Sequence, residues 1–258
     1  MKKTNDFRQL DYTPGSFLTI GSPVVTEIAA QYPFTWLLLD MEHGGFTESN
    51  LIDHLRVLTQ TGILSIVRIP AADPALISRV LDAGADGIML PHVVSAEQVE
   101  ACKKMMYYLP EGKRGFSSSV RQFAYGTNAP QDIAEIDKPL LFAQIEDVEG
   151  VLEANKIASV DGVDVLFVGP ADLKLALKYH ASELNYEEAL RKVAHAAIAS
   201  NKKGGLLVRD KAAIGQMRQL GYSCIAIDSD MAILRAGYEA IKHFAGIFSL
   251  ILICWGMV

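Results

Sequence analysis

The stretch from Leu140 to Asp172 decides the fold. It reads LLFAQIE over residues 140–146, then a polar segment ending in DGVD, then VLFVGPAD over residues 165–172. Each end is a short apolar run that stops at a carboxylate, and such runs between polar segments are typical of buried parallel strands. Between them, apolar residues recur at helical spacing from Val148 to Val160. The stretch therefore predicts a strand, a crossover helix and a second strand of one parallel sheet.

This unit also predicts where the chemistry lies. A right-handed crossover brings both strands to the same edge of the sheet, so we expect Glu146 and Asp172 side by side at the carboxyl edge. Two carboxylates in that position repel each other unless they share a proton or bind a cation.

Composition limits the class of protein. A chain of 258 residues, 50% hydrophobic and 21% charged, suits one α/β barrel or two small globular domains. Its net charge of -6, without a basic block, argues against nucleic acid as a partner. The three cysteines lie far apart and lack paired zinc spacing, which indicates reduced thiols. With a polar amino terminus that has no signal-peptide core, this predicts a cytoplasmic protein.

The carboxyl-terminal segment differs from the rest in composition. Residues 244–258 contain no charged side chain, but a membrane span needs about 20 apolar residues, so a membrane anchor is the weaker interpretation. We expect Gly246 to turn the chain and the apolar tail to pack against a neighbouring subunit of a homo-oligomer. The predicted organisation is a barrel domain over residues 1–243 and an apolar tail over residues 244–258.

Apolar runs alternate with helical patterns along the whole chain. The expected strands are residues 17–22, 36–43, 64–70, 87–92, 140–146, 165–172, 204–208 and 224–228. Eight strands that alternate with eight helices predict a single-domain (β/α)8 TIM barrel. A doubly wound open sheet is the alternative, but Gly21-Ser-Pro does not resemble the glycine-rich turn that usually follows its first strand. The stretch from Glu111 to Asn128 lacks periodicity, and a loop of this length is usually functional.

Polar residues follow most of the expected strands. They are Glu42, His43, Arg68, His92, Glu146, Asp172, Arg209 and Asp228. Singly, each has an ordinary structural explanation: Arg68 could form a surface ion pair, His92 could be structural, and Asp228 could cap the last helix. Asp40 either points into the barrel or pairs with a neighbour. An acid pair, a histidine and an arginine at one rim favour a catalytic site.

These residue types suggest a reaction. A divalent cation on Glu146 and Asp172 can chelate a 2-oxo acid and favour its enolate. Arg68 can stabilise the enolate oxygen, and His43 can act as base, directly or through a water. Schiff-base chemistry would need a lysine in the barrel, and none of the expected strand ends carries one.

Seven short motifs carry a resemblance to a known family. They are LLDMEHG (38–44), VRIP (67–70) followed by Asp73-Pro74, LDAG (81–84), LPHV (90–93), PEGKRG (110–115), QIE (144–146) and VGPADL (168–173). In this order the chain resembles the HpcH/HpaI family of metal-dependent, class II 2-oxo-acid aldolases over roughly residues 16–240. Members include 4-hydroxy-2-oxoheptanedioate aldolase and 2-dehydro-3-deoxyglucarate aldolase.

The resemblance implies roles for individual residues. Glu146 and Asp172 would bind Mg²⁺, Mn²⁺ or Co²⁺, Arg68 would lie at the enolate oxygen, and His43 would be the base or activate a water. Asp82 matches the carboxylate partner of that histidine.

The family likeness also implies a binding site and an assembly. Gln144 and the Gly169-Pro170-Ala171 backbone match positions that line the 2-oxo-acid site. Family members are commonly hexamers that exchange the last helix between neighbours. The loop after Gly115 and the tail after Phe244 depart from the family pattern, which leaves the second substrate open.

Three functions follow as hypotheses. The first is an aldolase that cleaves a 4-hydroxy-2-oxo acid to pyruvate and an aldehyde. The second is condensation of oxaloacetate with acetyl-CoA, as in the siderophore-pathway citrate synthases that resemble this family. The third is a catalytically silent barrel that serves as a binding module, which the intact set of Glu146, Asp172, Arg68 and His43 disfavours.

Overall fold

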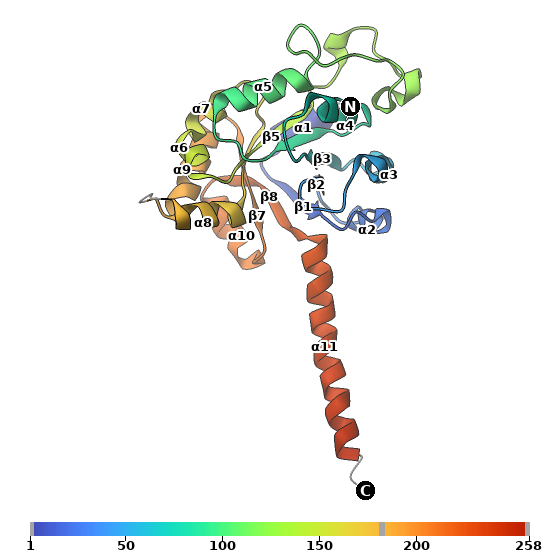
Figure 1. Ribbon diagram of the computed structural model, residues 1–258, viewed down its shortest axis with the longest axis vertical. Coiled ribbons are helices and arrows are strands. Elements are labelled where there is room, and N and C mark those ends of the chain that lie inside the picture. The colour runs from blue at the N-terminus through green and yellow to red at the C-terminus, as the bar shows by residue number, and fades with distance from the viewer. Residues whose placement is uncertain (1–2, 181–183, 256–258) are drawn as a thin grey trace.

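Eight parallel strands close into a barrel, each paired with the next in sequence and β8 paired with β1 (Figure 1). This computed structural model describes residues 3–180 and 184–255, with side chains over residues 4–180 and 184–242. The strands are β1 (Thr13–Leu18), β2 (Trp36–Asp40), β3 (Leu64–Arg68), β4 (Gly87–Leu90), β5 (Leu140–Ile145), β6 (Val165–Val168), β7 (Lys203–Val208) and β8 (Tyr222–Ser229). The predicted single-domain (β/α)8 barrel is confirmed.

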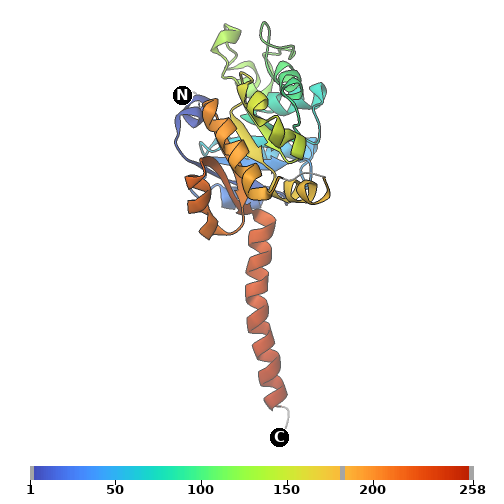
Figure 2. The same cartoon turned by 90° about the vertical axis from the view of Figure 1, so that its left-hand side faces the viewer.

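Helices surround the strands in both views of the molecule (Figures 1 and 2). The α-helices are α1 (Lys3–Gln9), α2 (Pro23–Ala29), α3 (Glu48–Thr59), α4 (Pro74–Asp82), α5 (Ala96–Met106), α6 (Val148–Leu152), α7 (Ala154–Ser159), α8 (Pro170–Tyr179), α9 (Tyr186–Ala199), α10 (Ile214–Gln219) and α11 (Asp230–Trp255). Short 3-10 helices are η1 (Arg121–Gly126), η2 (Ile133–Glu135) and η3 (Lys211–Ala213).

The helix starts follow from capping chemistry. Thr47 and Ser95 form capping boxes at α3 and α5, and Asp73 accepts the Leu76 N–H ahead of Pro74 at α4. The predicted crossover between β5 and β6 is instead two helices, because Glu153 leaves the helical conformation (φ −90°, ψ 3°). Asp210 caps the short 3-10 helix η3, and α10 follows it from Ile214.

Aromatic side chains fill the barrel interior. The ring centroids of Trp36 and Phe142 lie 5.5 Å apart, and Phe17 and Phe167 pack on the same cluster. The Trp36 indole N–H donates to the Thr13 carbonyl oxygen at 3.0 Å. Gly15 is required beside this ring, because a Cβ there would clash with it. The cluster supports the side chains that stand above it at the carboxyl edge.

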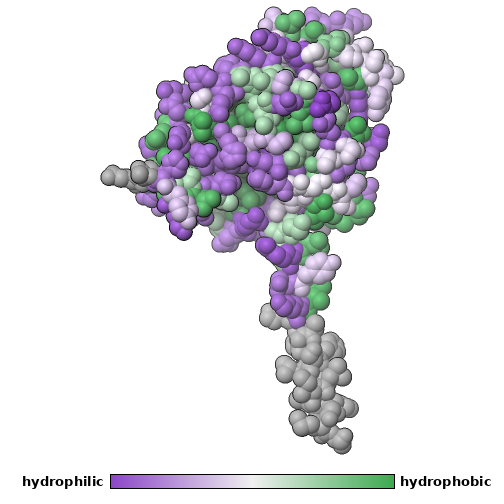
Figure 3. Space-filling model, in the orientation of Figure 1, coloured by the Kyte–Doolittle hydropathy of each residue, from purple (hydrophilic) through white to green (hydrophobic). Residues whose placement is uncertain are grey.

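Helix α11 projects away from the barrel (Figures 1 and 2). It continues without a break from Asp230 to Trp255, so the turn predicted at Gly246 is wrong. Hydrophobic and hydrophilic residues lie on opposite sides of its described turns (Figure 3). The predicted packing of the tail over residues 244–258 falls outside the side chains that the structure describes. In the described part of the chain, no helix combines the length and apolarity that a membrane crossing requires.

A histidine lies buried between α2 and α3. His54 is fully buried, and its Nδ1 is hydrogen-bonded to Thr26 Oγ1 at 2.7 Å. The Phe46 ring lies 4.5 Å from the imidazole, centroid to centroid. Burial lowers the pKa of His54, because the charged imidazolium loses its hydration there.

The stability of the protein should therefore fall on acidification. Below pH ~6.5 the unfolded imidazole binds a proton that folded His54 resists, so its contribution is complete above that pH and declines towards the folded-state pKa. The His54→Asn variant cannot titrate and should lose less free energy of unfolding between pH 8 and 5, measured by urea denaturation. Exposed His195→Asn is the control. Parallel pH curves for wild type and His54→Asn would contradict the assignment.

Candidate active site

A pocket of about 390 Å³ opens at the carboxyl edge of the barrel. Its apolar walls include Phe17, Phe167 and Leu207. Most of the residues predicted for the site from the sequence also line it: His43, Arg68, Gln144, Gly169, Pro170, Ala171 and Asp172. The structure therefore brings together side chains from strands that are far apart in the sequence.

The last residues of β2 and β3 form a buried ion pair. Asp40 and Arg68 are in register, and the guanidinium donates from Nε and Nη2 to the two carboxylate oxygens at 2.9 and 2.6 Å. Asp40 is 1% exposed and Arg68 is 8% exposed. Asp40 Oδ1 also accepts the backbone N–H groups of Glu42 and His43 at 3.1 and 3.2 Å. One carboxylate thus fixes both the arginine and the loop that carries the histidine.

Glu42 gives Arg68 a second acidic neighbour. Glu42 Oε2 lies 3.2 Å from Arg68 Nη1, and it is buried without a hydrogen bond among the described residues. Burial would lower the pKa of Arg68, but the hydrogen bonds that Arg68 donates to Asp40 and the negative charges of Asp40, Glu42 and Glu146 raise it. The guanidinium therefore stays charged. It has five N–H donors, and among the described residues three of them face these carboxylates, which leaves two for another group.

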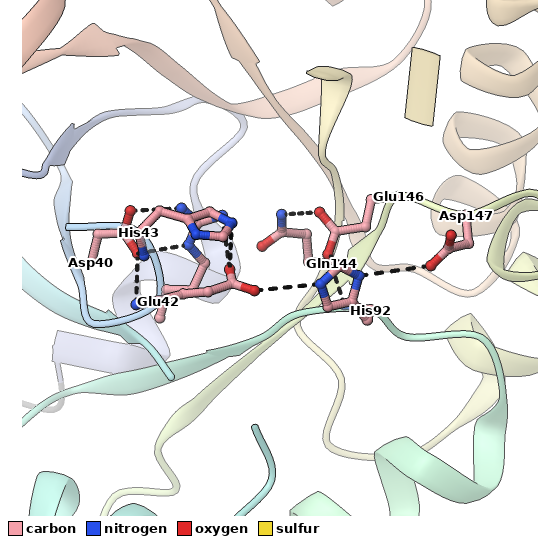
Figure 4. A network of polar contacts seen from close by, with 8 residues as sticks. Asp40, Glu42, His43, His92, Gln144, Glu146 and Asp147 are labelled. Carbon is pink, nitrogen blue, oxygen red and sulfur yellow. Dashed lines mark hydrogen bonds and ion pairs between the residues drawn. The ribbon is translucent and has the colours of Figure 1, made fainter. Parts of the chain in front are cut away.

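Glu146 follows β5 and is 1% exposed (Figure 4). Its Oε1 accepts the His92 backbone N–H at 2.8 Å, and its Oε2 accepts from Gln144 Nε2. Burial raises the pKa of Glu146; His92 opposes the shift, and the Glu42 and Asp172 carboxylates add to it. An ionised Glu146 therefore favours a further positive partner.

The turn after β6 comes close to this carboxylate. A Cβ on Gly169 would clash with Glu146 Oε2, so glycine permits the approach. Asp172 lies in the first turn of α8 and lines the pocket. Asp172 therefore lies in the helical turn that follows β6 and not at the end of the strand. It is still near enough to Glu146 to raise the pKa of Glu146.

The donor set near Glu146 fits a hard divalent cation. In the described residues, no three or more His, Cys, Asp or Glu side chains are grouped so as to hold a metal ion. The protein offers Glu146 and Asp172, and Gln144 Oε1 is a buried oxygen without a hydrogen-bond partner in the described chain. Mg²⁺ commonly takes one or two carboxylates and completes its shell with water and substrate oxygens. The residues present fit that mode of binding.

His92 is the site residue that the sequence reasoning did not assign. Its Nδ1 lies 3.1 Å from Glu146 Oε1, and its Nε2 lies 3.5 Å from Glu42 Oε1, so the ring bridges two carboxylates (Figure 4). Its backbone is in the left-handed region at φ 52°, which is strained for a non-glycine residue. This conformation aims the His92 N–H at Glu146. The LPHV motif after β4 was the available signal.

Asp82 does not contact His43 within the described chain, so their expected pairing stays a prediction. It is the last residue of α4, which starts after β3 at the carboxyl edge and ends at the opposite edge. Asp82 Oδ1 accepts from Arg114 Nη2 at 2.5 Å, and Arg114 also stacks on Tyr108. His43 Nε2 instead lies 3.9 Å from Glu42 Oε2. The pairing of Asp82 with His43 does not form within one chain.

Comparison with known proteins identifies the family. The HpcH/HpaI aldolase/citrate lyase family model matches residues 14–236, so the chain belongs to this family. It is 32% identical to the hydroxypyruvate/pyruvate aldolase of Paraburkholderia phytofirmans, over 92% of this chain and 94% of that protein.

Solved structures agree with this assignment. An HpcH/HpaI aldolase/citrate lyase family protein of Burkholderia cenocepacia superposes with a TM-score of 0.85 at 29% identity, covering 95% of this chain and 100% of that one. The citrate synthase SbnG superposes with a TM-score of 0.79 at 26% identity, covering 96% and 98%. Relatives of this fold thus include a citrate synthase as well as aldolases.

The buried ion pair should be essential for stability. Asp40→Asn removes the carboxylate that accepts two hydrogen bonds from buried Arg68 and leaves Glu42 as its remaining acidic contact. Breaking one side of a buried ion pair costs up to roughly 3 to 5 kcal/mol. Urea denaturation should show a loss of about this size in the free energy of unfolding. Glu48→Gln, which breaks the exposed pair with Arg79, is the matched control and should change little. Equal losses in the two variants would show that the Asp40 charge is not needed.

Proposed function

We propose that this chain is a divalent-metal-dependent aldolase that cleaves or forms a 4-hydroxy-2-oxo acid through the enolate of pyruvate. The observation that carries the proposal is a buried, charged Arg68 with free N–H groups in the pocket that Asp172 lines beside Glu146. An oxygen-rich cation site and a fixed guanidinium are what a 2-oxo acid needs as it gains charge. The similarity to the hydroxypyruvate/pyruvate aldolase supports the same reaction class.

Glu146 and Asp172 would hold the metal ion. Mg²⁺, Mn²⁺ or Co²⁺ bound there would supply Lewis acidity towards the carboxylate and ketone oxygens of the 2-oxo acid. Gln144 fixes Glu146 through its amide N–H and presents its own buried oxygen. The described residues that line the pocket include no lysine, which favours this class of aldolase over Schiff-base chemistry.

The remaining tasks, charge stabilisation and proton transfer, can be assigned to residues of this chain. In the cleavage direction the 4-hydroxyl loses its proton, the C3–C4 bond breaks to release an aldehyde, and C3 takes up a proton to give pyruvate. The free N–H groups of Arg68 stabilise the negative charge that develops on the ketone oxygen. His43, which lines the pocket and is 64% exposed, accepts the hydroxyl proton directly or through a water.

Citrate formation from oxaloacetate and acetyl-CoA is the second candidate. The similarity to the citrate synthase SbnG favours it, and the same pocket could hold oxaloacetate by its 2-oxo-acid end. Release of pyruvate from a 4-hydroxy-2-oxo acid supports the aldolase, and release of free CoA thiol supports the synthase.

Cytoplasmic location and a homo-oligomer complete the proposal. The exposed apolar residues Ile233, Leu234 and Ile241 of α11 support an assembly in which a neighbour covers that helix.

Removal of the metal should abolish activity and leave the fold intact. Exhaustive chelation should stop deuterium exchange at the methyl group of pyruvate, and Mg²⁺ or Mn²⁺ should restore it. Glu146→Gln and Asp172→Asn should weaken Mn²⁺ binding in a calorimeter while circular dichroism stays native. Glu149→Gln, which alters an exposed carboxylate on α6, is the control. Full exchange in chelated enzyme, or a borohydride-reduced adduct of pyruvate on a lysine, would exclude this mechanism.

Arg68 should affect turnover more than metal binding. Arg68→Lys keeps the charge but loses the forked geometry towards Asp40 and the donors that face the substrate. Loss of one such donor typically lowers kcat by about 100- to 1,000-fold. Steady-state kinetics should show this drop, while Mn²⁺ affinity stays within a few-fold of wild type. A variant with nearly normal kcat would remove Arg68 from the proposed role.

A further inference from the structure

The first residue of α11 binds the turn that follows β1. Asp230 Oδ1 accepts the Thr19 N–H and the Thr19 hydroxyl, both at 2.8 Å, and Asp230 Oδ2 accepts the Ile20 N–H at 3.1 Å. Asp230 Oδ1 also accepts the Met231 N–H at 2.7 Å. Asp230 is buried, and hydrogen bonds from backbone N–H groups to a carboxylate are strong. One carboxylate therefore fixes the turn after β1 against the start of α11.

The turn after β1 also holds the loop that carries His43. The Thr19 carbonyl oxygen accepts the Gly45 N–H at 2.8 Å, and Gly45 lies two residues after His43. A Cβ on Gly45 would clash with the Ile20 carbonyl oxygen, so glycine permits the two backbones to meet here. Two hydrogen bonds thus connect Asp230 with the His43 loop, one at the N–H of Thr19 and one at its carbonyl oxygen.

The His43 loop is therefore fixed on both sides of the histidine. Asp40 accepts the N–H groups of Glu42 and His43 on the strand side, and Thr19 accepts the Gly45 N–H on the helix side. The imidazole itself is mostly exposed, and its ion-pair contact among the described residues is with Glu42 Oε2 at 3.9 Å. With so few contacts of its own, the imidazole takes its position in the pocket from the backbone of the loop.

We propose that Asp230 is a positioning residue for His43 and acts through the turn after β1. This inference rests on the proposed aldolase function, in which His43 is the base. Proton transfer requires the base within hydrogen-bonding reach of the proton that it removes. A displacement of about 1 Å can lower the rate of a reaction 100-fold, so loosening the loop would impair the base without removing it. The start of α11 thereby contributes to the site without touching metal or substrate.

Amide hydrogen exchange followed by mass spectrometry tests the contact itself, without any reaction. Asp230→Asn replaces one acceptor oxygen by an amino group, so the Thr19 and Ile20 N–H groups can no longer both be accepted. Residues 19–21 and 41–46 should exchange roughly five- to tenfold faster than in wild type, and α5 should not change. Asp132→Asn, which alters a carboxylate that accepts the Ala134 N–H after α5, is the control. Unchanged exchange over residues 41–46 in Asp230→Asn would overturn the proposal.

A double-mutant cycle tests whether Asp230 acts through His43. Exchange of the methyl protons of pyruvate for deuterium needs a base in the pocket, and His43 is the proposed one. Asp230→Asn should slow this exchange roughly 10- to 100-fold, with Mn²⁺ affinity within a few-fold of wild type. In a His43→Ala background the same substitution should change the rate by less than about twofold, because no base is left to misplace. Asp230→Glu, which keeps both acceptor oxygens, should restore part of the rate.

The possible failures can be told apart. If wild type exchanges pyruvate protons and Asp230→Asn slows exchange equally with and without His43, the effect does not pass through the base, and the role of Asp230 is overturned while the aldolase stands. If Asp230→Asn does not fold, Thr19→Val, which removes one donor to the same carboxylate, should show the same pattern at smaller size, and additive effects would overturn the role. If wild type does not exchange pyruvate protons, the proposed function fails and the positioning role fails with it.

Discussion

The ion pair between Arg68 and Asp40 is the interaction on which the site depends. A charged guanidinium that is 8% exposed needs a partner, and the parallel register of β2 and β3 supplies one at the next strand end. The same carboxylate accepts the backbone N–H groups that lead to Glu42 and His43. One carboxylate therefore both compensates the charge of the arginine and holds the loop of the proposed base.

The acidic side of the site differs from the Arg68–Asp40 pair, because no permanently charged group in the described part of the chain donates a hydrogen bond to its buried carboxylate. Glu146 is buried and receives hydrogen bonds from Gln144 and His92, but these donors carry no fixed positive charge. Burial still raises the pKa of Glu146, and Asp172 adds a like charge. Among the described residues, the Glu146 and Asp172 carboxylates thus lack a permanently positive partner, while Arg68 has N–H donors that no carboxylate occupies. A divalent cation would compensate the two carboxylates, and a 2-oxo acid bound to it would accept hydrogen bonds from Arg68.

Much of this arrangement could be predicted from the sequence. In a parallel barrel the carboxyl ends of all strands meet, so short apolar runs that stop at polar residues were enough to bring Arg68, Glu146 and Asp172 together. Gln144, which lies within β5, was expected there from the family resemblance alone. Helix starts followed local capping rules at Thr47, Asp73 and Ser95.

The remaining features depend on long-range contacts or on backbone conformation. The bridging position of His92 requires φ 52°, which no periodicity indicates for a histidine. Asp82 pairs with Arg114 because the long loop after α5 returns to the end of α4, a tertiary contact without a local signal. The uninterrupted course of α11 through Gly246 was missed because a single glycine weakens a helix without ending it.

Diffraction from crystals grown with Mn²⁺ and pyruvate tests the central claim most directly. Anomalous scattering at the manganese edge locates the ion independently of the protein phases. We predict one strong peak bonded to an oxygen of Glu146 and an oxygen of Asp172, with the ketone oxygen of pyruvate in hydrogen-bonding contact with Arg68. A peak away from these two carboxylates, or pyruvate bound out of reach of Arg68, would contradict the account.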